Sequence, residues 1–571
     1  MPRWNPAPSI PKEIDGELHH YPKLVRQMLY RRGIETRDRA ERFLHPDYER
    51  DLNDPFGLIG MDRAVGRIIE AIKLGERIVI YADYDADGIP GSVILNDFFV
   101  KIGFTNFSVY IPHRYTEGYG LHRAAVESFG REGANLIITI DTGISNVAEI
   151  ACAGELGIDV IVIDHHLPGN ALPEAYAIVN PNQEGDAYPC RFLSAGGLVF
   201  KLVQGLLKRG NFDLTPGWEK WLLDVTSIST IADMVPLKDE NRALAYFGLS
   251  VLKKTTRPGL VGLFRSRRIR HEDITEDDVG FVITPRINVA SRLDVPMNAF
   301  HLLATRDGAQ ASHLLAHLEE KNTERKQVVL EMMEDITDRL KDWRGGGLIY
   351  IGDTSWKPGV LGLAAMRIVE LYHTPAFVWG QEGSTVVRGS ARSDGSINVV
   401  RLMEQVPEGF FLDYGGHSRS GGFSVEPGGT SRLGEALYHA LLSTPRGVAE
   451  DDAVTVESSL ALEDVTWELY NSISSLAPFG VGNPKPIFLF EKLCVIRVNR
   501  FGANGIHLRL DLESEKGTRA SAIGFNHPKE FSANLVGEDQ RVDVLATVER
   551  NTWCGARELR LRLVGINARP L

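Results

Sequence analysis

Between residues 77 and 166 the chain alternates short, wholly hydrophobic runs with amphipathic segments. The runs have the length and the β-branched content of strands that are covered on both faces of a sheet. The segments between them space their hydrophobic residues as a helix does. This alternation predicts a doubly wound α/β fold with a parallel sheet, whose strands are "RIVIYAD", "FSVYIP", "NLIITID" and "DVIVID".

Three other patterns follow toward the C-terminus. An amphipathic, highly charged segment at residues 308–342 predicts a long connecting helix, and the "RGGG" after it predicts a turn. A second α/β unit then combines a helix-like segment, "GVLGLAAMRIVELY", with a few strands. Beyond residue 455, short strands separated by turn residues predict a small β-barrel of the OB type.

The chain is too long for one hydrophobic core. The patterns above therefore predict an α/β multidomain protein and indicate where its domains begin and end. The segment "STPRGVAEDDAV", residues 443–454, marks the last boundary. The expected parts are an N-terminal extension that packs on the first α/β domain (1–60), that domain itself (61–305), the connecting helix (306–343), a smaller second α/β domain (344–445) and the OB-like barrel (455–571).

Composition narrows the class of protein. The formal net charge of the 571 residues is -12, which argues against a generally basic surface but leaves local basic grooves open. The four cysteines are far apart and form no CxxC pair, so neither a zinc knuckle nor a disulfide framework is expected. The sequence contains no hydrophobic leader and no hydrophobic run of about 18 residues, so we expect a cytoplasmic protein without membrane association.

Polar residues that can bind metals stand directly after the hydrophobic runs. In open α/β sheets the carboxyl ends of the strands form the edge where ligands bind. For a single acid there, a solvated turn or a helix N-cap is the ordinary alternative. Several acids and imidazoles at one edge would crowd charge, and cations relieve that crowding. The residues are Asp83, Asp85 and Asp87 in "DYDADG", Asp141 in "IDTG", Asp164, His165 and His166 in "IDHH", and Asp233 in "IAD".

The number and type of these side chains favour two cations. Carboxylates with a few imidazoles suit Mn²⁺ or Mg²⁺ better than a softer metal. They exceed what one octahedral ion can accept while it keeps positions for water and substrate. Two ions about 3.5 to 4 Å apart stabilise an in-line displacement at phosphorus. We therefore expect a two-metal phosphodiesterase whose nucleophile is hydroxide.

In order and spacing, the motifs "DYDADG", "IDTG", "DHH" and "IAD" resemble those of the DHH phosphoesterase superfamily. Further blocks, among them "IPHRYTEGYGL", "TPRINVASRLD", "KPGVLGLAAMRI", "GGHSRSGGF" and "PFGVGNPKPIF", resemble the RecJ family, over about residues 75 to 525. The resemblance implies a DHH catalytic domain, a DHH-associated domain and an OB domain. It also implies hydrolysis of single-stranded DNA from 5′ to 3′ into 5′-mononucleotides, in DNA repair and recombination.

The resemblance assigns roles to the residues of the metal-binding edge. Asp141 is the best candidate for a carboxylate that bridges both ions. His166 would face the scissile phosphate, and Asp164 would orient the imidazoles without touching a metal. Asp224 is expected to be structural support. The implied metal ligands are Asp83, Asp85, Asp87, Asp141, His165 and Asp233, and which of the first three binds which ion stays open.

Substrate-binding positions follow from the same resemblance. Arg114 can bind a phosphate bidentately, and Tyr119 offers a ring on which a base can stack. Ser390 and Arg392 in "GSARS" resemble a pocket for the terminal 5′-phosphate, which would explain the polarity. For each arginine the alternative is an ion pair at the surface or between domains. Further phosphate contacts are implied for Arg286, His417, Gly415 and Gly416, the glycines because they let the backbone approach closely.

Single-stranded DNA is the implied partner, and a single-strand-binding protein and a helicase are further candidates. A monomer is expected. Residues 253–270 hold seven Lys or Arg and no acid, so this segment is either a solvated face or the wall of a channel for the strand.

Two alternative functions stay open. A nanoRNase or cyclic-dinucleotide phosphodiesterase of the same superfamily would share the metal site, but the barrel and the "PFGVGNP" block argue against these smaller enzymes. A replication scaffold would keep the fold and lose catalysis. Every expected metal-binding position is filled in this chain, which argues against a scaffold.

Overall fold

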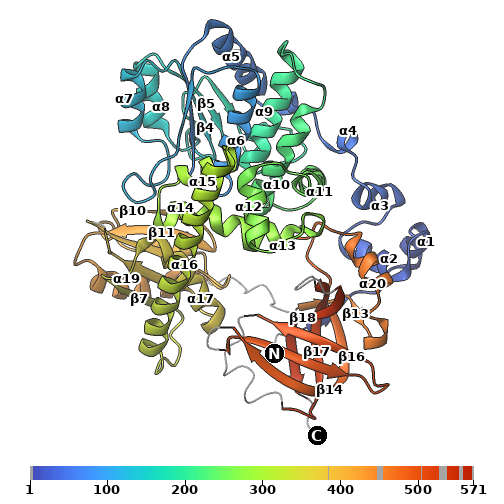
Figure 1. The fold of residues 1–571 in the computed structure, drawn as a ribbon. Coiled ribbons are helices and arrows are strands. Elements are labelled where there is room, and N and C mark those ends of the chain that lie inside the picture. The colour runs from blue at the N-terminus through green and yellow to red at the C-terminus, as the bar shows by residue number, and fades with distance from the viewer. Residues whose placement is uncertain are drawn as a thin grey trace.

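The computed structural model describes residues 4–383, 385–445, 454–502, 505–525, 537–551 and 557–568. Figure 1 shows two α/β units joined by a long helix, with a barrel beside the N-terminal helices. The predicted boundary at residues 443–454 falls largely outside the described residues. Within the described part of the chain, no helix has the length and hydrophobicity needed to span a membrane.

The first unit contains a sheet of parallel strands in the order β3-β2-β4-β5-β6. All residues of its central strands β2 and β4 are buried, because helices cover both faces. The predicted doubly wound sheet is therefore confirmed. Its strands are β2 (Ile78–Ala82), β3 (Phe107–Tyr110), β4 (Leu136–Ile140), β5 (Asp159–Ile163) and β6 (Ala177–Val179).

The two faces of this sheet form separate hydrophobic cores. Ile78 and Ile80 pack with helices α5, α6 and α9, whereas Val79 and Tyr81 pack with α7 and α8 on the opposite face. Alternate residues of one strand therefore support different layers, as the pleat requires. The helices are α5 (Met61–Leu74), α6 (Gly88–Lys101), α7 (Arg123–Arg131), α8 (Val147–Glu155) and α9 (Ala195–Arg209).

A helical layer continues the first unit and leads to the connecting helix α16 (Gly308–Arg339). In the basic segment 253–270, Arg257 is buried and pairs with Asp97 and Asp224, at 2.8 and 2.9 Å. Asp224 therefore supports the fold. Because Arg257 is buried in these ion pairs, it does not line a channel for the DNA strand. The helices of the layer are α10 (Leu223–Ala232), α11 (Asp239–Leu252), α12 (Pro258–Ser266), α13 (Glu276–Asp278), α14 (Thr284–Leu293) and α15 (Met297–Ala304).

The second unit has a mixed sheet in the order β10-β11-β9-β8-β7. Only β7 and β8 are parallel; the other pairs are antiparallel. Helix α17 packs on one face and α18 and α19 on the other, in two cores. The elements are β7 (Ile349–Asp353), α17 (Leu361–Tyr372), β8 (Ala376–Gly380), β9 (Val387–Arg392), α18 (Val399–Glu404), β10 (Asp413–His417), β11 (Ser420–Val425) and α19 (Thr430–Ser443).

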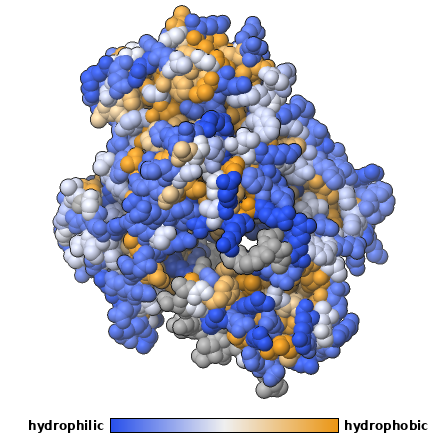
Figure 2. All heavy atoms as spheres, viewed as in Figure 1, coloured by the Kyte–Doolittle hydropathy of each residue, from blue (hydrophilic) through white to orange (hydrophobic). Residues whose placement is uncertain are grey.

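The C-terminal part is a closed barrel, because strand β14 pairs with both β15 and β17. Closure leaves no unpaired sheet edge between these strands. Figure 2 shows a mainly hydrophilic surface on this side of the molecule, with hydrophobic residues gathered over the barrel and the top of the first unit. The elements are β12 (Val454–Val456), β13 (Ser458–Ser459), α20 (Trp467–Ser474), β14 (Phe488–Phe501), β15 (His507–Glu513), β16 (Arg519–Gly524), β17 (Arg541–Asn551) and β18 (Glu558–Ala568).

The N-terminal segment corrects one prediction. We expected residues 1–60 to pack on the first α/β domain, and Leu58 with its neighbours Tyr48, Leu52 and Phe56 does so. The buried side chains from Leu18 to Leu44 instead share one hydrophobic core with the barrel strands. Strand β1 also pairs with β12 next to the barrel. Each of these short helices has one hydrophobic face, which can be recognised in the sequence. The sequence does not show which part of the protein covers that face. The elements are β1 (Trp4–Pro6), α1 (Lys12–Glu17), α2 (Lys23–Arg31), α3 (Arg37–Leu44) and α4 (Tyr48–Asp51).

Candidate metal centre and phosphate site

Asp83 and Asp141 lie side by side at the point where the strand order of the first sheet reverses, between β2 and β4. Asp83 follows β2 and Asp141 follows β4, and these strands are neighbours although β3 lies between them in the sequence. The pairing continues past the strands, because Asp83 N donates to Ile140 O at 3.0 Å and Asp141 N to Ile163 O at 2.9 Å. This switch point is where ligands bind in open α/β sheets.

The backbone at this edge is shaped for the carboxylates. Asp141 has a positive φ of 62°, which aspartate tolerates better than most residues and which marks strain at functional sites. Gly88 starts helix α6 directly against the backbone of Asp83, where any Cβ would collide with it. The sharp turn in "DYDADG" therefore needs its glycine, and it brings Asp85 and Asp87 back over the strand end.

The side chains of this edge form three overlapping groups whose ligand atoms lie within 4.8 Å of one another. Asp141 belongs to two of them and His165 to two, so the groups are joined into one cluster. A cluster of this kind has room for more than one cation with a shared carboxylate. The groups are Asp83, Asp85 and Asp141; Asp87, His165 and Asp233; and Asp141, His165 and His166.

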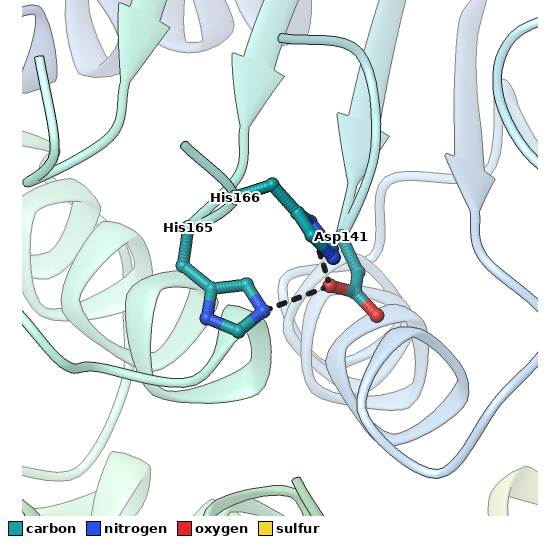
Figure 3. A group of neighbouring side chains, drawn as sticks. All are labelled: Asp141, His165 and His166. Atoms are coloured by element: carbon teal, nitrogen blue, oxygen red, sulfur yellow. Dashed lines mark ion pairs between the residues drawn. The ribbon is translucent and has the colours of Figure 1, made fainter. Parts of the chain in front are cut away.

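His165 is at the centre of the cluster. Its Nε2 is 3.2 Å from Asp141 Oδ1, 3.5 Å from Asp87 Oδ2 and 3.7 Å from Asp233 Oδ2. Figure 3 shows both histidines of the "DHH" motif directed at the Asp141 carboxylate. The imidazole thus faces three carboxylates from different elements, an arrangement suited to sharing a cation with them.

His166 is oriented by Asp164, which is fully buried at the end of β5. His166 Nδ1 lies 2.8 Å from Asp164 Oδ1, and the same carboxylate accepts the backbone N–H groups of His165, His166 and Ile144. Burial acts to raise the pKa of Asp164, but these hydrogen bonds lower it overall. Burial likewise acts to lower the pKa of His166, and Asp164 raises it overall. The pair therefore favours a proton on His166 Nδ1.

Asp87 and Asp233 reach the cluster from helices. Asp87 Oδ2 accepts the N–H of Ala195 at 2.8 Å and Oδ1 that of Gly196 at 2.9 Å, at the start of α9. Asp233 was expected at the end of a strand, but it directly follows helix α10. The hydrophobic run before it contains Ile228 and Ile231, which indicated a strand; the segment is helical and ends at the same edge.

The electrostatic environment of the acids in the cluster favours the binding of cations. Burial, reinforced by neighbouring carboxylates, raises the pKa of Asp83 and Asp141 well above the ordinary value. The same causes raise the pKa of Asp233 to about 9. Among the described residues, Oδ1 of Asp83 and Oδ1 of Asp141 are buried without a hydrogen-bond donor. Divalent cations would supply both missing partners and offset the repulsion, so the residues fit the expected metals.

Tyr119 and His417 border the cluster. The Tyr119 hydroxyl donates to the backbone carbonyl of Asp141 at 3.1 Å and lies 3.3 Å from His166 Nδ1, while its side chain stays exposed. His417, on β10 of the second unit, stacks on His166 with ring centroids 6.3 Å apart. The two α/β units therefore face each other across the metal-binding edge.

The residues expected to bind a terminal phosphate lie together in the second unit. Arg392 Nη1 donates to Ser390 Oγ at 3.1 Å on β9. A Cβ at Gly362 would be 3.0 Å from Arg392 Nη2, so the N-terminus of α17, a favourable place for an anion, borders the pair. Gly415 faces open space, whereas Gly416 has φ 137° and no room for a Cβ.

The other two predicted arginines differ in their surroundings. The Arg114 guanidinium lies over the ring of Tyr84, 5.0 Å from its centroid, and near Arg392. Arg286 is buried and pairs with Glu319 of the connecting helix at 3.4 Å. For Arg286 the structure thus has the ion pair that was the alternative, and Arg286 does not join the group around Arg392.

Two residues near the histidines were not singled out from the sequence. Asn180 Nδ2 donates to the carbonyl of His166 at 2.9 Å, and Asn182 Nδ2 to that of His165 at 2.6 Å. They follow β6 in "NPNQ". Their position after a strand of the same parallel sheet was the signal, since the carboxyl ends of its strands share one edge.

Comparison with known proteins agrees with this arrangement. The sequence matches the DHH family, N-terminal domain, over residues 77–230, the DHHA1 domain over 322–441 and the RecJ OB domain over 456–565. It is 34% identical to the single-stranded-DNA-specific exonuclease RecJ of Bacillus subtilis, over 98% of this chain and 70% of that protein. With the RecJ of Haemophilus influenzae it shares 30% identity over 96% of each chain. The crystal structure of RecJ in complex with Mn²⁺ from Thermus thermophilus superposes with a TM-score of 0.82, at 26% identity, covering 100% of this chain and 80% of that one.

Proposed function

Because the chain belongs to the RecJ family of single-stranded-DNA-specific exonucleases, we propose that it removes nucleotides from the 5′ end of single-stranded DNA by metal-dependent hydrolysis. The observation that carries this proposal is the cluster in which Asp141 is shared between groups of metal-binding side chains. Its members come from distant parts of the sequence, and a purely structural role would leave their charge without compensation.

We assign two cation positions to this cluster. Asp83 and Asp85 would hold one ion and Asp87, His165 and Asp233 the other, and Asp141, which belongs to two of the ligand groups, would be shared between them. Oxygen ligands with one imidazole favour Mn²⁺ or Mg²⁺. When bound, such ions neutralise the carboxylates, activate a water molecule and stabilise negative charge at phosphorus.

His166 acts on the phosphate and not on a metal in this proposal. Asp164 holds the Nδ1 side of the ring, which leaves Nε2 directed away from Asp164. The contact of Nδ1 with the buried Asp164 carboxylate favours the imidazolium, whose charge stabilises a phosphate that gains negative charge in the transition state. His417 of the second unit stacks on this ring, so it is placed to contact the same phosphate.

The terminal 5′-phosphate binds to Ser390 and Arg392, beside the N-terminus of α17. Arg114 and Tyr119 contact the first nucleotide, and the exposed backbone at Gly415 and Gly416 approaches the DNA closely. A pocket that recognises a chain end next to the reactive centre releases mononucleotides and sets the 5′ to 3′ direction. Arg286 supports the connecting helix through Glu319 instead.

The cellular setting rests on the resemblance alone. We propose that the protein acts as a monomer in the cytoplasm, in DNA repair and recombination. A single-strand-binding protein and a helicase stay predicted partners.

One digestion assay tests the proposed function. Single-stranded and double-stranded oligodeoxynucleotides, labelled at the 5′ or the 3′ end, are incubated with the protein and Mn²⁺ or Mg²⁺. We expect a 5′-labelled single strand to release labelled mononucleotide at once, and a 3′-labelled one to shorten progressively. Digestion that starts from the 3′ end, or that proceeds equally well after chelation of the metal, would contradict the proposal. A faster rate on a dinucleotide than on a long strand would favour the alternative of a small-substrate phosphodiesterase.

A further inference from the structure

The serine at position 229 has no role in the function so far, although its side chain contacts a proposed metal ligand. Ser229 lies on helix α10 and is fully buried. Its hydroxyl donates to Asp87 Oδ1 at 2.5 Å, although the two residues are 142 positions apart in the sequence. Because the Asp87 carboxylate is itself buried, its orientation depends on such hydrogen bonds and not on water.

The Ser229 hydroxyl completes the hydrogen bonding of one oxygen of Asp87. Oδ1 also accepts the N–H of Gly196, so it accepts two hydrogen bonds. Oδ2 accepts a single N–H, from Ala195, and it is the oxygen that faces His165 Nε2 at 3.5 Å. An ionised carboxylate has about two lone-pair sites on each oxygen. Oδ2 therefore keeps a lone pair for a cation, whereas both sites of Oδ1 are used.

A chain of buried hydrogen bonds fixes Ser229 as a donor. Ser194 Oγ lies 2.7 Å from Ser229 Oγ and accepts the N–H of Gly197 at 3.2 Å, as the N-cap of α9. An ionised carboxylate can only accept and a backbone N–H can only donate. Since Ser229 gives its one proton to Asp87, Ser194 donates to Ser229. All bonds of the chain then point toward Asp87, and each polarises the next.

Ser229 also connects Asp87 to a second ligand of the same group. The backbone carbonyl of Ser229 accepts the N–H of Asp233 at 3.0 Å, about one helical turn further along α10. A Cβ at Gly196 would lie 2.4 Å from Ser229 Oγ, so a glycine is required where α9 begins against α10. The same residue therefore bonds to Asp87 through its side chain and to Asp233 through its backbone, and these two acids form one ligand group with His165.

We propose that Ser229 is a positioning residue, which fixes Asp87 relative to Asp233 and restricts Asp87 to one ligand oxygen. Its hydroxyl sets the affinity of the cation position that these two acids share with His165, and it leaves the other cation position unchanged. The proposal rests on the proposed function for the identity of the cations, Mn²⁺ or Mg²⁺. Groups that hold a metal ligand in place change metal affinity by about 10- to 100-fold when they are removed.

The first test measures cation binding without DNA. Ser229→Ala removes the hydroxyl and keeps the Cβ. Mn²⁺ is titrated into the full-length, metal-free protein, and the free ion is followed by its electron paramagnetic resonance signal. We expect one of the two Mn²⁺ affinities to weaken by about 10-fold and the other to stay unchanged. Ser227→Ala is the matched control, because Ser227 is buried on the same helix but its hydroxyl donates to the carbonyl of Asp224 at 2.9 Å.

Digestion of single-stranded DNA gives a second readout. In Ser229→Ala the Mn²⁺ concentration for half-maximal activity should rise by a similar factor, whereas kcat at saturating Mn²⁺ should fall much less, because excess ion fills the weakened position. A merely structural role would instead lower the melting temperature of the metal-free protein and leave the dependence on Mn²⁺ as it was.

The outcomes separate this inference from the nuclease assignment. Unchanged Mn²⁺ affinities in Ser229→Ala, or an equal loss at both positions, would overturn the inference and leave the nuclease assignment intact. A protein that digests no single strand but loses Mn²⁺ affinity in Ser229→Ala would refute the nuclease and retain the role of Ser229. If Ser229→Ala does not fold, Ser194→Ala decides, because it removes the group that orients the Ser229 hydroxyl and should weaken the same affinity by a smaller factor.

Discussion

Two regions of the molecule bury charges of one sign. One is the acidic metal-binding edge of the first unit. The other is the junction between the units, where Arg292 donates to the carbonyl of Gly359 and has Arg114 and Arg392 as neighbours. At the edge, burial and then neighbouring carboxylates raise the pKa values of Asp83, Asp141 and Asp233. Between the units, burial and then neighbouring guanidinium groups lower the pKa values of Arg292 and Arg392. Each place is unfavourable alone, because buried charges of one sign repel.

The two places also differ in how they are built. The edge is formed mainly by segments that follow neighbouring strands of one sheet, and helix termini add Asp87 and Asp233. The junction joins four separate segments of the two units: the loop after β3 at Tyr115, helix α14 at Arg292, the turn before α17 at Gly359 and strand β9 at Arg388. The difference teaches that the acidic cluster is assembled within one unit, whereas the arginines come together only when the two units meet. The following predictions separate these effects.

The largest effect is expected at the shared carboxylate. Asp141→Asn keeps the volume of the side chain and removes the charge that both cation positions use. We expect kcat on single-stranded DNA to fall by about 10³-fold, the upper end for loss of one group that stabilises the transition state. Steady-state digestion with saturating Mn²⁺ measures it, and Asp213→Asn at an exposed acid is the control. A variant with normal metal-dependent activity would refute the two-cation assignment.

Loss of the phosphate pocket should be smaller and selective. Arg392→Ala removes the guanidinium next to Ser390 and the start of α17. We expect kcat/KM to fall about 10²-fold on a 5′-phosphorylated strand, because a charge-assisted hydrogen bond to phosphate is lost. The 5′-hydroxyl strand should be affected far less. Equal losses on both strands would mean that Arg392 supports the fold and not the recognition of the end.

A residue that holds a histidine should have a moderate effect. Asn180→Ala removes the amide that binds the carbonyl of His166. We expect activity to fall by about 10-fold, within the range for residues that orient metal or phosphate ligands. The KM for DNA should change little, since Asn180 does not lie in the phosphate pocket. An increase in KM with normal kcat would contradict this role.

The smallest expected effect is on the thermal stability of the protein, measured at two pH values with and without a divalent cation. A raised carboxyl pKa in the folded, metal-free protein stabilises it at low pH, and this contribution is lost as pH rises toward the value of about 9 for Asp233. Cations compete with those protons, so they should stabilise the protein more at high pH. We expect the rise in melting temperature caused by Mg²⁺ to be larger at pH 8.5 than at pH 6.5 by roughly 2 to 4 °C. Asp141→Asn should weaken this dependence, and an equal rise at both pH values would argue against direct carboxylate ligation.

The sequence by itself determined the elements of the first unit and most of its candidate ligands. Runs such as "NLIITID" and "DVIVID" are continuous because both faces of the strands are buried, a local pattern that needs no knowledge of the rest. The residues after such runs had to meet at one edge, since parallel strands end together. Asp83, Asp141 and His165 follow from that rule.

Only the tertiary structure decided what depends on contacts between distant segments. Asp233 joins the cluster from the end of a helix, and Arg286 pairs with Glu319 of the connecting helix. The N-terminal helices pack on the barrel, and Arg292 meets Gly359 across two units. A hydrophobic face or a charged side chain in the sequence indicates that a partner is needed. It does not indicate which partner, because that depends on the packing of the whole chain.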